Sequence, residues 1–175
     1  MKKLTLLFLA IFTLFGVNAQ RQKFGFVDTE YILNKLPEYK SAQKQLDEFS
    51  NLWQQEISNA YALIDKKFKE YKAEEPLLTA NQKREKTEEI MKLETDVRKF
   101  ENEKFGPEGE LFKKRQELIK PIQDKVFKAI EKVSQDGAYD FVFDIAANVV
   151  FLKTDPKNDL SDEVLSELGV VNSKD

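Results

Sequence analysis

The longest regular pattern in the chain is one apolar stripe that begins at Tyr39. Apolar residues recur every three or four positions, at Tyr39, Ala42, Leu46, Phe49, Trp53, Ile57, Ala60, Ile64, Phe68 and Tyr71. The mean step is about 3.6 residues, which is the period of an α-helix. At about 1.5 Å per residue, a helix over residues 38–73 would span roughly 54 Å. The core of one small domain cannot cover that length, so the helix is expected to project.

A second apolar stripe follows a break at residues 74–78. Thr79 and Gln82 have the spacing of a capping box, in which each side chain bonds a backbone N–H at a helix start. The stripe runs through Ile90, Leu93, Val97 and Phe100 and resumes at Leu111, Leu118, Ile122, Val126, Ala129 and Val133. A short connection between long helices predicts an antiparallel hairpin. We expect a hairpin arm over residues 38–136 with its tip near 74–80.

The sequence Gly106-Pro107-Glu108-Gly109 interrupts the second stripe, which continues on both sides of it. Proline and glycine are the usual causes of breaks and sharp kinks in helices. We therefore expect a kink or hinge at 106–109, where the arm meets the rest of the protein. Pro121 is a second, milder kink candidate.

Short elements flank the arm and are expected to form a small body from residues 20–37 and 137–175. Residues 24–28 alternate large and small residues and β-formers and predict a short strand, and a helical turn or two follows over residues 29–36. Residues 139–145 and 149–153 are β-rich runs that predict a hairpin.

Capping residues mark the helix ends of the second half. Gly137, directly after Asp136, is predicted to end the arm as a left-handed cap. Ser161 is predicted to cap the N-terminus of a short helix that runs through Leu168 and ends before Gly169.

The predicted fold class is α+β, mostly α, with a long antiparallel helical hairpin projecting from a small β body. Three short strands cannot bury a core alone, so we expect other copies of the chain to complete the body. The residues expected in this oligomeric body are Phe24, Phe26, Tyr139, Phe141, Phe143, Val149 and Phe151.

The first residues have the three parts of a secretory signal peptide. Lys2 and Lys3 precede an apolar run over residues 4–17, and small residues end it at Ala19. The alternative, a transmembrane anchor, would need roughly 20 apolar residues, more than this run contains. We expect cleavage after Ala19 and export of the mature chain.

The chain contains no Cys and no His. Their absence excludes Cys and Ser-His-Asp nucleophile systems, disulfides and the usual Cys/His zinc sites. The carboxylate pairs Glu88/Glu89, Glu101/Glu103 and Glu108/Glu110 lie among lysines, as on a solvated helix face. No phosphate loop, dinucleotide fingerprint or EF-hand loop is present. We expect no enzyme, metal or cofactor, and an envelope hydrolase using carboxylates is the least favoured alternative.

Charge is distributed unevenly along the chain. There are 28 Lys and Arg against 31 Asp and Glu, and removal of Lys2 and Lys3 leaves 28 − 2 = 26 basic residues and a net charge of 26 − 31 = −5. Residues 65–86 hold seven basic and five acidic residues, whereas residues 137–175 hold three basic and eight acidic. The basic residues near the tip are Lys66, Lys67, Lys69, Lys72, Lys83, Arg84 and Lys86.

Two interpretations of the tip stay open. Its charges either solubilise the arm or attract an anionic lipid surface or acidic clients. Leu77 and Leu78 are apolar residues where a thin hairpin has little core, which is typical of a contact with a partner. Trp53, in contrast, has stripe spacing and is expected to pack between the helices. Net charge and export argue against binding of nucleic acid.

The whole mature chain resembles the Skp/OmpH family of periplasmic chaperones. The residues that carry the resemblance are the opening strand 24–28 after a leader, the charged hairpin, Lys120-Pro121-Ile122-Gln123-Asp124-Lys125-Val126 with Ala129-Ile130, Tyr139-Asp140-Phe141-Val142-Phe143-Asp144, Asn148-Val149-Val150 and Asp162-Glu163-Val164-Leu165. Their order and spacing are more specific than any one of them. Well-known members are markedly basic, whereas this mature chain is acidic, so the tip lysines and Arg84 are its remaining source of attraction for anions.

The resemblance implies a jellyfish-shaped homotrimer in the periplasm, whose strands form the body and whose hairpins enclose a cavity. It implies an ATP-independent holdase that keeps unfolded outer-membrane β-barrel proteins soluble for insertion. A rival reading is a non-catalytic coiled-coil adaptor or structural protein of the envelope that binds one folded partner.

Overall fold

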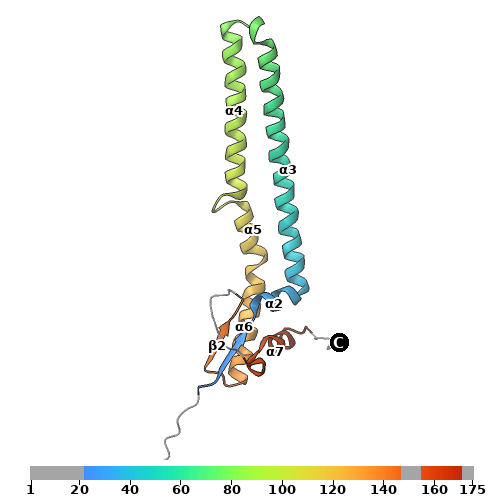
Figure 1. Ribbon diagram of the computed structural model, residues 1–175, viewed down its shortest axis with the longest axis vertical. Coiled ribbons are helices and arrows are strands. Elements are labelled where there is room, and N and C mark those ends of the chain that lie inside the picture. The colour runs from blue at the N-terminus through green and yellow to red at the C-terminus, as the bar shows by residue number, and fades with distance from the viewer. Residues whose placement is uncertain (1–21, 147–154, 171–175) are drawn as a thin grey trace, which may run out of the picture.

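The computed structural model describes residues 22–146 and 155–170, which form a small body and a long arm (Figure 1). The body contains β1 (Phe24–Val27), α2 (Thr29–Lys35), α6 (Lys120–Asp136), β2 (Phe141–Asp144), the 3₁₀ turn η2 (Pro156–Asn158) and α7 (Ser161–Glu167). The arm contains α3 (Pro37–Glu74), the 3₁₀ turn η1 (Glu75–Leu77), α4 (Ala80–Phe105) and α5 (Glu110–Leu118). The expected α+β, mostly α class with a projecting hairpin is confirmed.

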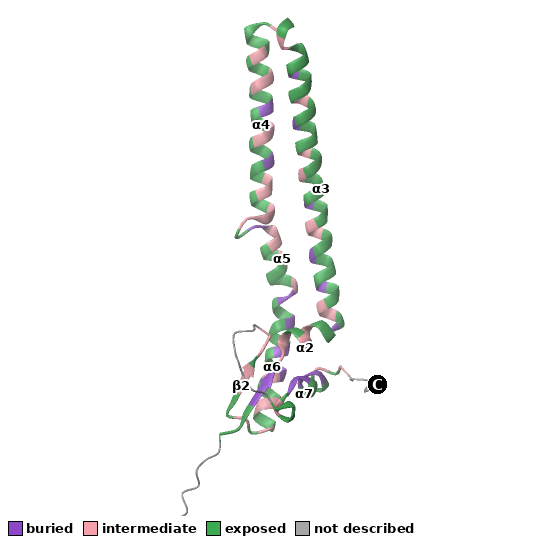
Figure 2. Cartoon of the chain, viewed as in Figure 1, coloured by how far each residue is buried: buried purple, intermediate pink, exposed green. Residues whose placement is uncertain are grey.

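The expected first long helix is present as α3, a single helix of 38 residues. Pro37 occupies its first turn, where the missing N–H of proline costs no hydrogen bond. The stripe residues Ala42, Leu46, Trp53, Ile64 and Tyr71 are buried, while much of the remaining helix surface is exposed (Figure 2). Ala42 and Leu46 join the core of the body, and Ile64 and Tyr71 pack with Ile90 and Val97 of α4. The helix is therefore held by one narrow apolar seam.

The hairpin reverses through η1 and the predicted capping box. The Thr79 hydroxyl accepts a hydrogen bond from Gln82 N at 3.4 Å, and the Gln82 carboxamide oxygen accepts one from Thr79 N at 2.9 Å. These bonds satisfy backbone donors at the start of α4 and fix where it begins. α4 then returns antiparallel to α3 (Figure 1).

The break at 106–109 lies within the arm, not at its junction with the body as expected, because α5 also packs against α3 (Figure 1). A Cβ on Gly106 would lie 2.3 Å from Asn102 O, and one on Gly109 would lie 2.8 Å from Lys104 O. Both glycines thus let α5 start against the end of α4 while the loop projects sideways. A second interruption of one residue, Ile119, separates α5 from α6 just before Pro121.

Within the described residues, β1 and β2 form a two-stranded parallel sheet in which Phe24 pairs with Phe141 and Val27 with Asp144. The entire arm lies between these strands in the sequence. The second β-rich run, with Val149 and Phe151, lies outside the described residues, so the expected hairpin with residues 139–145 stays a prediction. On the other side of β1, Leu160 N donates to Phe26 O at 2.9 Å and attaches the segment before α7.

The core of the body is apolar and joins both ends of the chain. Its most buried side chains are Ile32, Leu36, Leu165, Val27 and Val164. Three polar contacts fix the same junction: Asp28 N donates to the buried Ser161 hydroxyl at 3.0 Å, and Thr29 donates from its N–H and hydroxyl to the Asp144 carboxylate. The body is thus built across the base of the arm.

Two predicted caps are wrong in detail. Ser161 is the first residue of α7 and not its N-cap, because its hydroxyl accepts the hydrogen bond from Asp28 N. Gly137 has φ −83°, and the left-handed residue is Ala138 at φ 50°. Gly137 N still bonds Val133 O as a helical donor, so the backbone reverses one residue later than expected. Gly169 follows α7 at φ 79°, as the sequence predicts.

Within the ranges that the structure describes, no helix has the length and apolar content needed to cross a membrane.

Candidate functional site

The two leucines of the tip have different environments. Leu77, in η1, is 86% exposed and is the most exposed large apolar residue described. Leu78 is half-buried and packs against the upper arm cluster of Ile64, Tyr71, Ile90 and Val97. Only Leu77 therefore presents its side chain to a partner at the tip.

The basic residues of the tip are largely paired with carboxylates. Two pairs bridge the helices, Lys67 to Glu89 and Lys86 to Glu74, each at 2.7 Å. The others form within one turn: Lys66 with Glu70, Lys69 with Asp65, Lys72 with Glu75 and Arg84 with Glu88. Lys83 lies close enough to Glu75 for its positive charge to help lower the pKa of that carboxyl group. The surplus of positive charge in residues 65–86 is thus offset by Glu88 and Glu89, directly beyond that range.

The pKa values of the tip follow from these contacts. The hydrogen bond from Lys72 holds the pKa of Glu75 below its usual value, and the bond from Lys67 does the same for Glu89. The bond to Glu74 raises the pKa of Lys86. All of these shifts stabilise the charged forms, so the tip remains a neutralised network and not an open cationic patch.

An aromatic cluster holds the middle of the arm. Trp53 is buried, stacks on Phe49 with ring centroids 5.7 Å apart, and meets the edge of Phe105 at 6.1 Å. Lys104 Nζ lies 5.0 Å from the Trp53 ring centroid. The prediction that Trp53 packs between the helices is confirmed.

The seam between the two halves of the arm is closed by lysines on one side, which we name the sealed side. Lys67 and Lys86 cross it to reach Glu89 and Glu74. Lower down, Lys104 Nζ lies 5.4 Å from the Phe100 ring centroid and Lys114 Nζ lies 5.6 Å from that of Phe49. Phe49 and Lys67 are five full helical turns apart and therefore share one side of α3.

The opposite side of the seam, which we name the open side, holds a shallow groove of about 330 Å³. It is lined by Gln54, Ile57, Ser58, Glu101 and Phe105. Tyr61 lies above it and donates its hydroxyl proton to Glu101 at 3.2 Å. Loss of hydration and the Glu101 carboxylate raise the pKa of Tyr61.

Helical geometry separates the two sides. At about 100° per residue, Tyr61 and Lys67 lie about 120° apart around α3. Glu101 and Glu89, their partners on α4, are also about 120° apart. Since both contacts cross the same seam, they lie on opposite sides of it.

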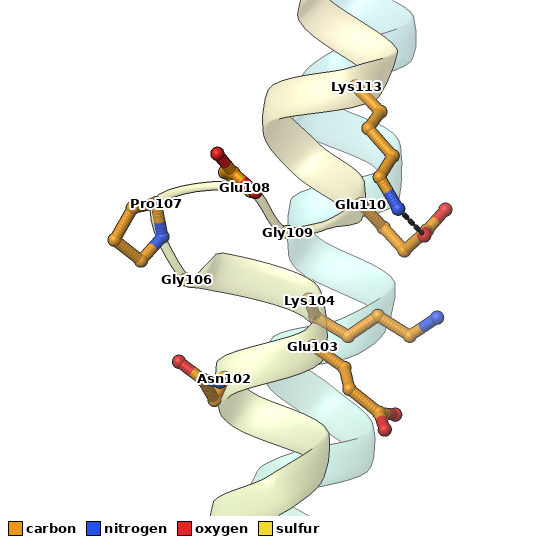
Figure 3. Close-up of a pocket in the computed structure, with 9 residues that line it drawn as sticks. All are labelled: Asn102, Glu103, Lys104, Gly106, Pro107, Glu108, Gly109, Glu110 and Lys113. Carbon is orange, nitrogen blue, oxygen red and sulfur yellow. Dashed lines mark hydrogen bonds and ion pairs between the residues drawn. The ribbon is translucent and has the colours of Figure 1, made fainter.

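The loop at 106–109 forms a second open hollow of about 490 Å³ with the adjoining turns of α4 and α5 (Figure 3). Pro107 points outward, and Glu110 binds Lys113 at 3.1 Å, which lowers the pKa of Glu110. Three acidic and two basic side chains line the hollow: Glu103, Glu108, Glu110, Lys104 and Lys113. Among the described residues, no group of acidic side chains could hold a metal ion.

Of the six carboxylates paired in the sequence, Glu88, Glu89, Glu103 and Glu110 form ion pairs on the helix surface, and Glu101 accepts the hydrogen bond from Tyr61. Glu88 binds Arg84, Glu89 binds Lys67 and Glu103 binds Lys99. These contacts give the carboxylates a role in the surface charge network.

The structure places four of the predicted body residues, Phe24, Phe26, Phe141 and Phe143, on one face of the sheet. The Phe24 ring stacks on Phe141 at 5.6 Å and on Phe143 at 6.3 Å between centroids. Phe24 and Phe141 are 45% and 49% exposed. Phe26, two residues further along β1, shares that face by strand alternation, pairs with Phe143 and is buried. Tyr139 lies under the Lys23 ammonium at 3.9 Å. Val149 and Phe151 lie outside the described residues.

The sequence reasoning did not single out one exposed aromatic residue of the body. Phe127 on α6 is 68% exposed beside a groove of about 170 Å³. The groove is also lined by Thr29, Leu33, Gln123, Val126 and Ile130. The available signal was its position next to Val126, outside the apolar stripe of that helix.

Two comparisons with known proteins relate the chain to others. The family model described as "Outer membrane protein (OmpH-like)" matches residues 23–168, well over half of the chain. A protein of Aquifex aeolicus (strain VF5) described as uncharacterized is 31% identical over 165 residues, covering 92% of this chain and 94% of the relative.

The match includes both the body and the arm, so it applies to the architecture as a whole. It supports a periplasmic, non-catalytic role of the chaperone type. The chain belongs to the OmpH-like family.

Proposed function

We propose that the protein is an ATP-independent holdase of the periplasm. It binds unfolded outer-membrane β-barrel proteins between helical arms and keeps them soluble until they are inserted. A cleavable signal peptide over residues 1–19, which lie outside the described part of the chain, is proposed to direct its export.

The observation that carries this proposal is the projecting arm. A helix of 38 residues has only a narrow seam to bury, and most of its surface remains exposed above a small body. Such arms would surround a large volume if several copies stood side by side. Many weak contacts on such arms would hold a chain without a nucleotide-driven step.

The proposed assembly is a homotrimer joined through the body. The two strands that the structure describes leave the aromatic rings of Phe24 and Phe141 half-exposed on one face of the sheet. Isolated sheets of this size are marginal in water, so burial of this face by other copies would stabilise it.

Contact of the tip with an anionic membrane surface remains a weaker part of the proposal. Leu77 is suitably exposed for it, but most tip lysines already bind carboxylates. We therefore assign the tip contact to the apolar side chain and only secondarily to charge.

The deciding experiment is light scattering of a urea-unfolded outer-membrane porin diluted with and without the protein. Suppression of aggregation near one trimer per porin is the expected result. No suppression at that ratio would exclude the holdase. Retention of one folded envelope protein, and no unfolded barrel proteins, in pulldowns would favour the adaptor instead.

A further inference from the structure

We infer that the open side of the arm seam, between Ile57 and Phe105, is the surface on which an apolar segment of an unfolded polypeptide docks. This inference rests on the proposed holdase function and specifies which side of the arm contacts the client. The sealed side is assigned to holding the hairpin together.

The first argument is access to the apolar seam. On the sealed side, long lysine side chains lie over the aromatic rings and reach carboxylates on the opposite helix. A client would have to break these contacts to reach apolar surface there. On the open side, the described contact across the seam is the hydrogen bond from Tyr61 to Glu101, and below it Ile57 and Phe105 line an unfilled groove.

The second argument is the chemistry of the groove. Its floor is apolar, and its rim carries the uncharged amide of Gln54 and hydroxyl of Ser58, which can exchange hydrogen bonds with a peptide backbone. A volume of about 330 Å³ suits one or two side chains of an extended segment, not a folded domain.

The third argument is charge. Glu101 is on the rim, and the nearby Arg98 binds Glu94 at 3.0 Å. An anionic ligand such as a lipid headgroup would meet a carboxylate and no unshared cation on this rim. A neutral polypeptide segment would not be repelled by this carboxylate.

The test uses a photo-crosslinking amino acid, p-benzoylphenylalanine, in place of Ser58 on the open side. The matched control places it at Leu63, which is 46% exposed and lies four residues from Lys67 on the sealed side. Each purified protein is irradiated with a urea-unfolded porin diluted into buffer. We expect several-fold more porin adduct from position 58 than from position 63.

A binding measurement supports the same test without a crosslinker. Ile57→Ser should weaken binding of the labelled unfolded porin about tenfold, whereas Leu63→Ser should leave it within about twofold. Circular dichroism and sedimentation of both variants check that helix content and oligomeric mass are unchanged.

The outcomes separate this inference from the proposed function. If the wild-type protein keeps the porin soluble but both positions crosslink equally, the holdase stands and the docking site is wrong. Crosslinks from position 58 to a second copy of the chain would also overturn it, since the groove would then be closed within the assembly. If the wild-type protein fails to protect the porin, both proposals fall.

Discussion

Phe24 on β1 and Phe141 on β2 stack with their ring planes 15° apart and their centroids separated by 5.6 Å. The two residues are paired in the parallel sheet, yet they are 117 positions apart in the sequence. Both rings remain about half exposed in the single chain. Burial of this aromatic face by a partner surface would therefore stabilise the body.

A charge in this face should prevent assembly of the body. We expect Phe141→Asp to reduce the sedimentation mass from trimer to monomer, because a carboxylate would have to be buried without a partner. Phe112→Asp is the matched control, since Phe112 is 47% exposed but lies on α5 in the arm. Equal masses for the two variants would argue against this face as the interface.

The two leucines of the tip should respond differently to the same change. Leu77→Asp should alter the free energy of unfolding by no more than about 0.5 kcal/mol, because its side chain is exposed. Leu78→Asp should cost about 1–3 kcal/mol, because it places a charge against the upper arm cluster. Urea unfolding followed by helical circular dichroism measures both.

The client affinity of Leu77→Asp is a separate measurement. A weaker complex with unfolded porin at unchanged stability would assign the tip to binding. An unchanged affinity would leave Leu77 with no part in it.

Gly106 should be difficult to replace. A Cβ at this position would lie 2.3 Å from the Asn102 carbonyl oxygen, so Gly106→Ala must displace the end of α4. We expect a loss of about 1–3 kcal/mol in the free energy of unfolding. Glu108→Ala, in the same loop but exposed, should change it by less than about 0.5 kcal/mol. If Gly106→Ala lowers the free energy of unfolding no more than Glu108→Ala does, the loop tolerates the added Cβ atom.

The ion pair between Glu38 and Lys125 should make stability depend on acid pH. Lys125 Nζ lies 2.7 Å from the Glu38 carboxylate, connects α3 to α6, and lowers the pKa of Glu38 from 4.5. A lowered pKa stabilises the folded state above the unfolded value, and that contribution is lost as the pH falls through the folded pKa.

We therefore expect the Glu38→Gln variant to be less stable than the wild-type protein near pH 7. The difference in free energy of unfolding should disappear as the pH falls well below 4.5, because the wild-type protein then loses the ion pair as well. The pair is partly exposed, so the effect should be about 0.2–1 kcal/mol. Lys125→Gln should have a similar effect, and the double variant should add little, because both remove one interaction. Additive losses across the cycle would contradict the pairing.

Much of the arm can be predicted from sequence because its contacts are local. The seam of α3 repeats every three or four residues, and the Thr79 capping box joins residues three apart. Gly106 and Gly109 predict an interruption for the same reason. Backbone preferences and contacts within one or two turns are sufficient to place these features.

Contacts between residues far apart in the sequence could not be predicted from these local patterns. A charge count over residues 65–86 gives a basic tip, but the crossing pairs Lys67–Glu89 and Lys86–Glu74 depend on the alignment of two antiparallel helices. The burial of Leu78 and the exposure of Leu77 follow from the same alignment. The replacement of the Ser161 cap by a bond to Asp28 results from the packing of the chain ends.

The sequence by itself determined the helical arm, its tip, its interruption and the absence of Cys and His chemistry. Only the tertiary structure decided that β1 pairs in parallel with β2, that the tip charges are shared across the hairpin, and that one side of the seam is sealed while the other is open. The physical reason is the sequence separation over which each kind of interaction acts. Helix periodicity and capping act over a few residues, whereas strand pairing and side-chain contacts across the seam join residues from 12 to 117 positions apart, as in Lys86–Glu74 and Phe24–Phe141.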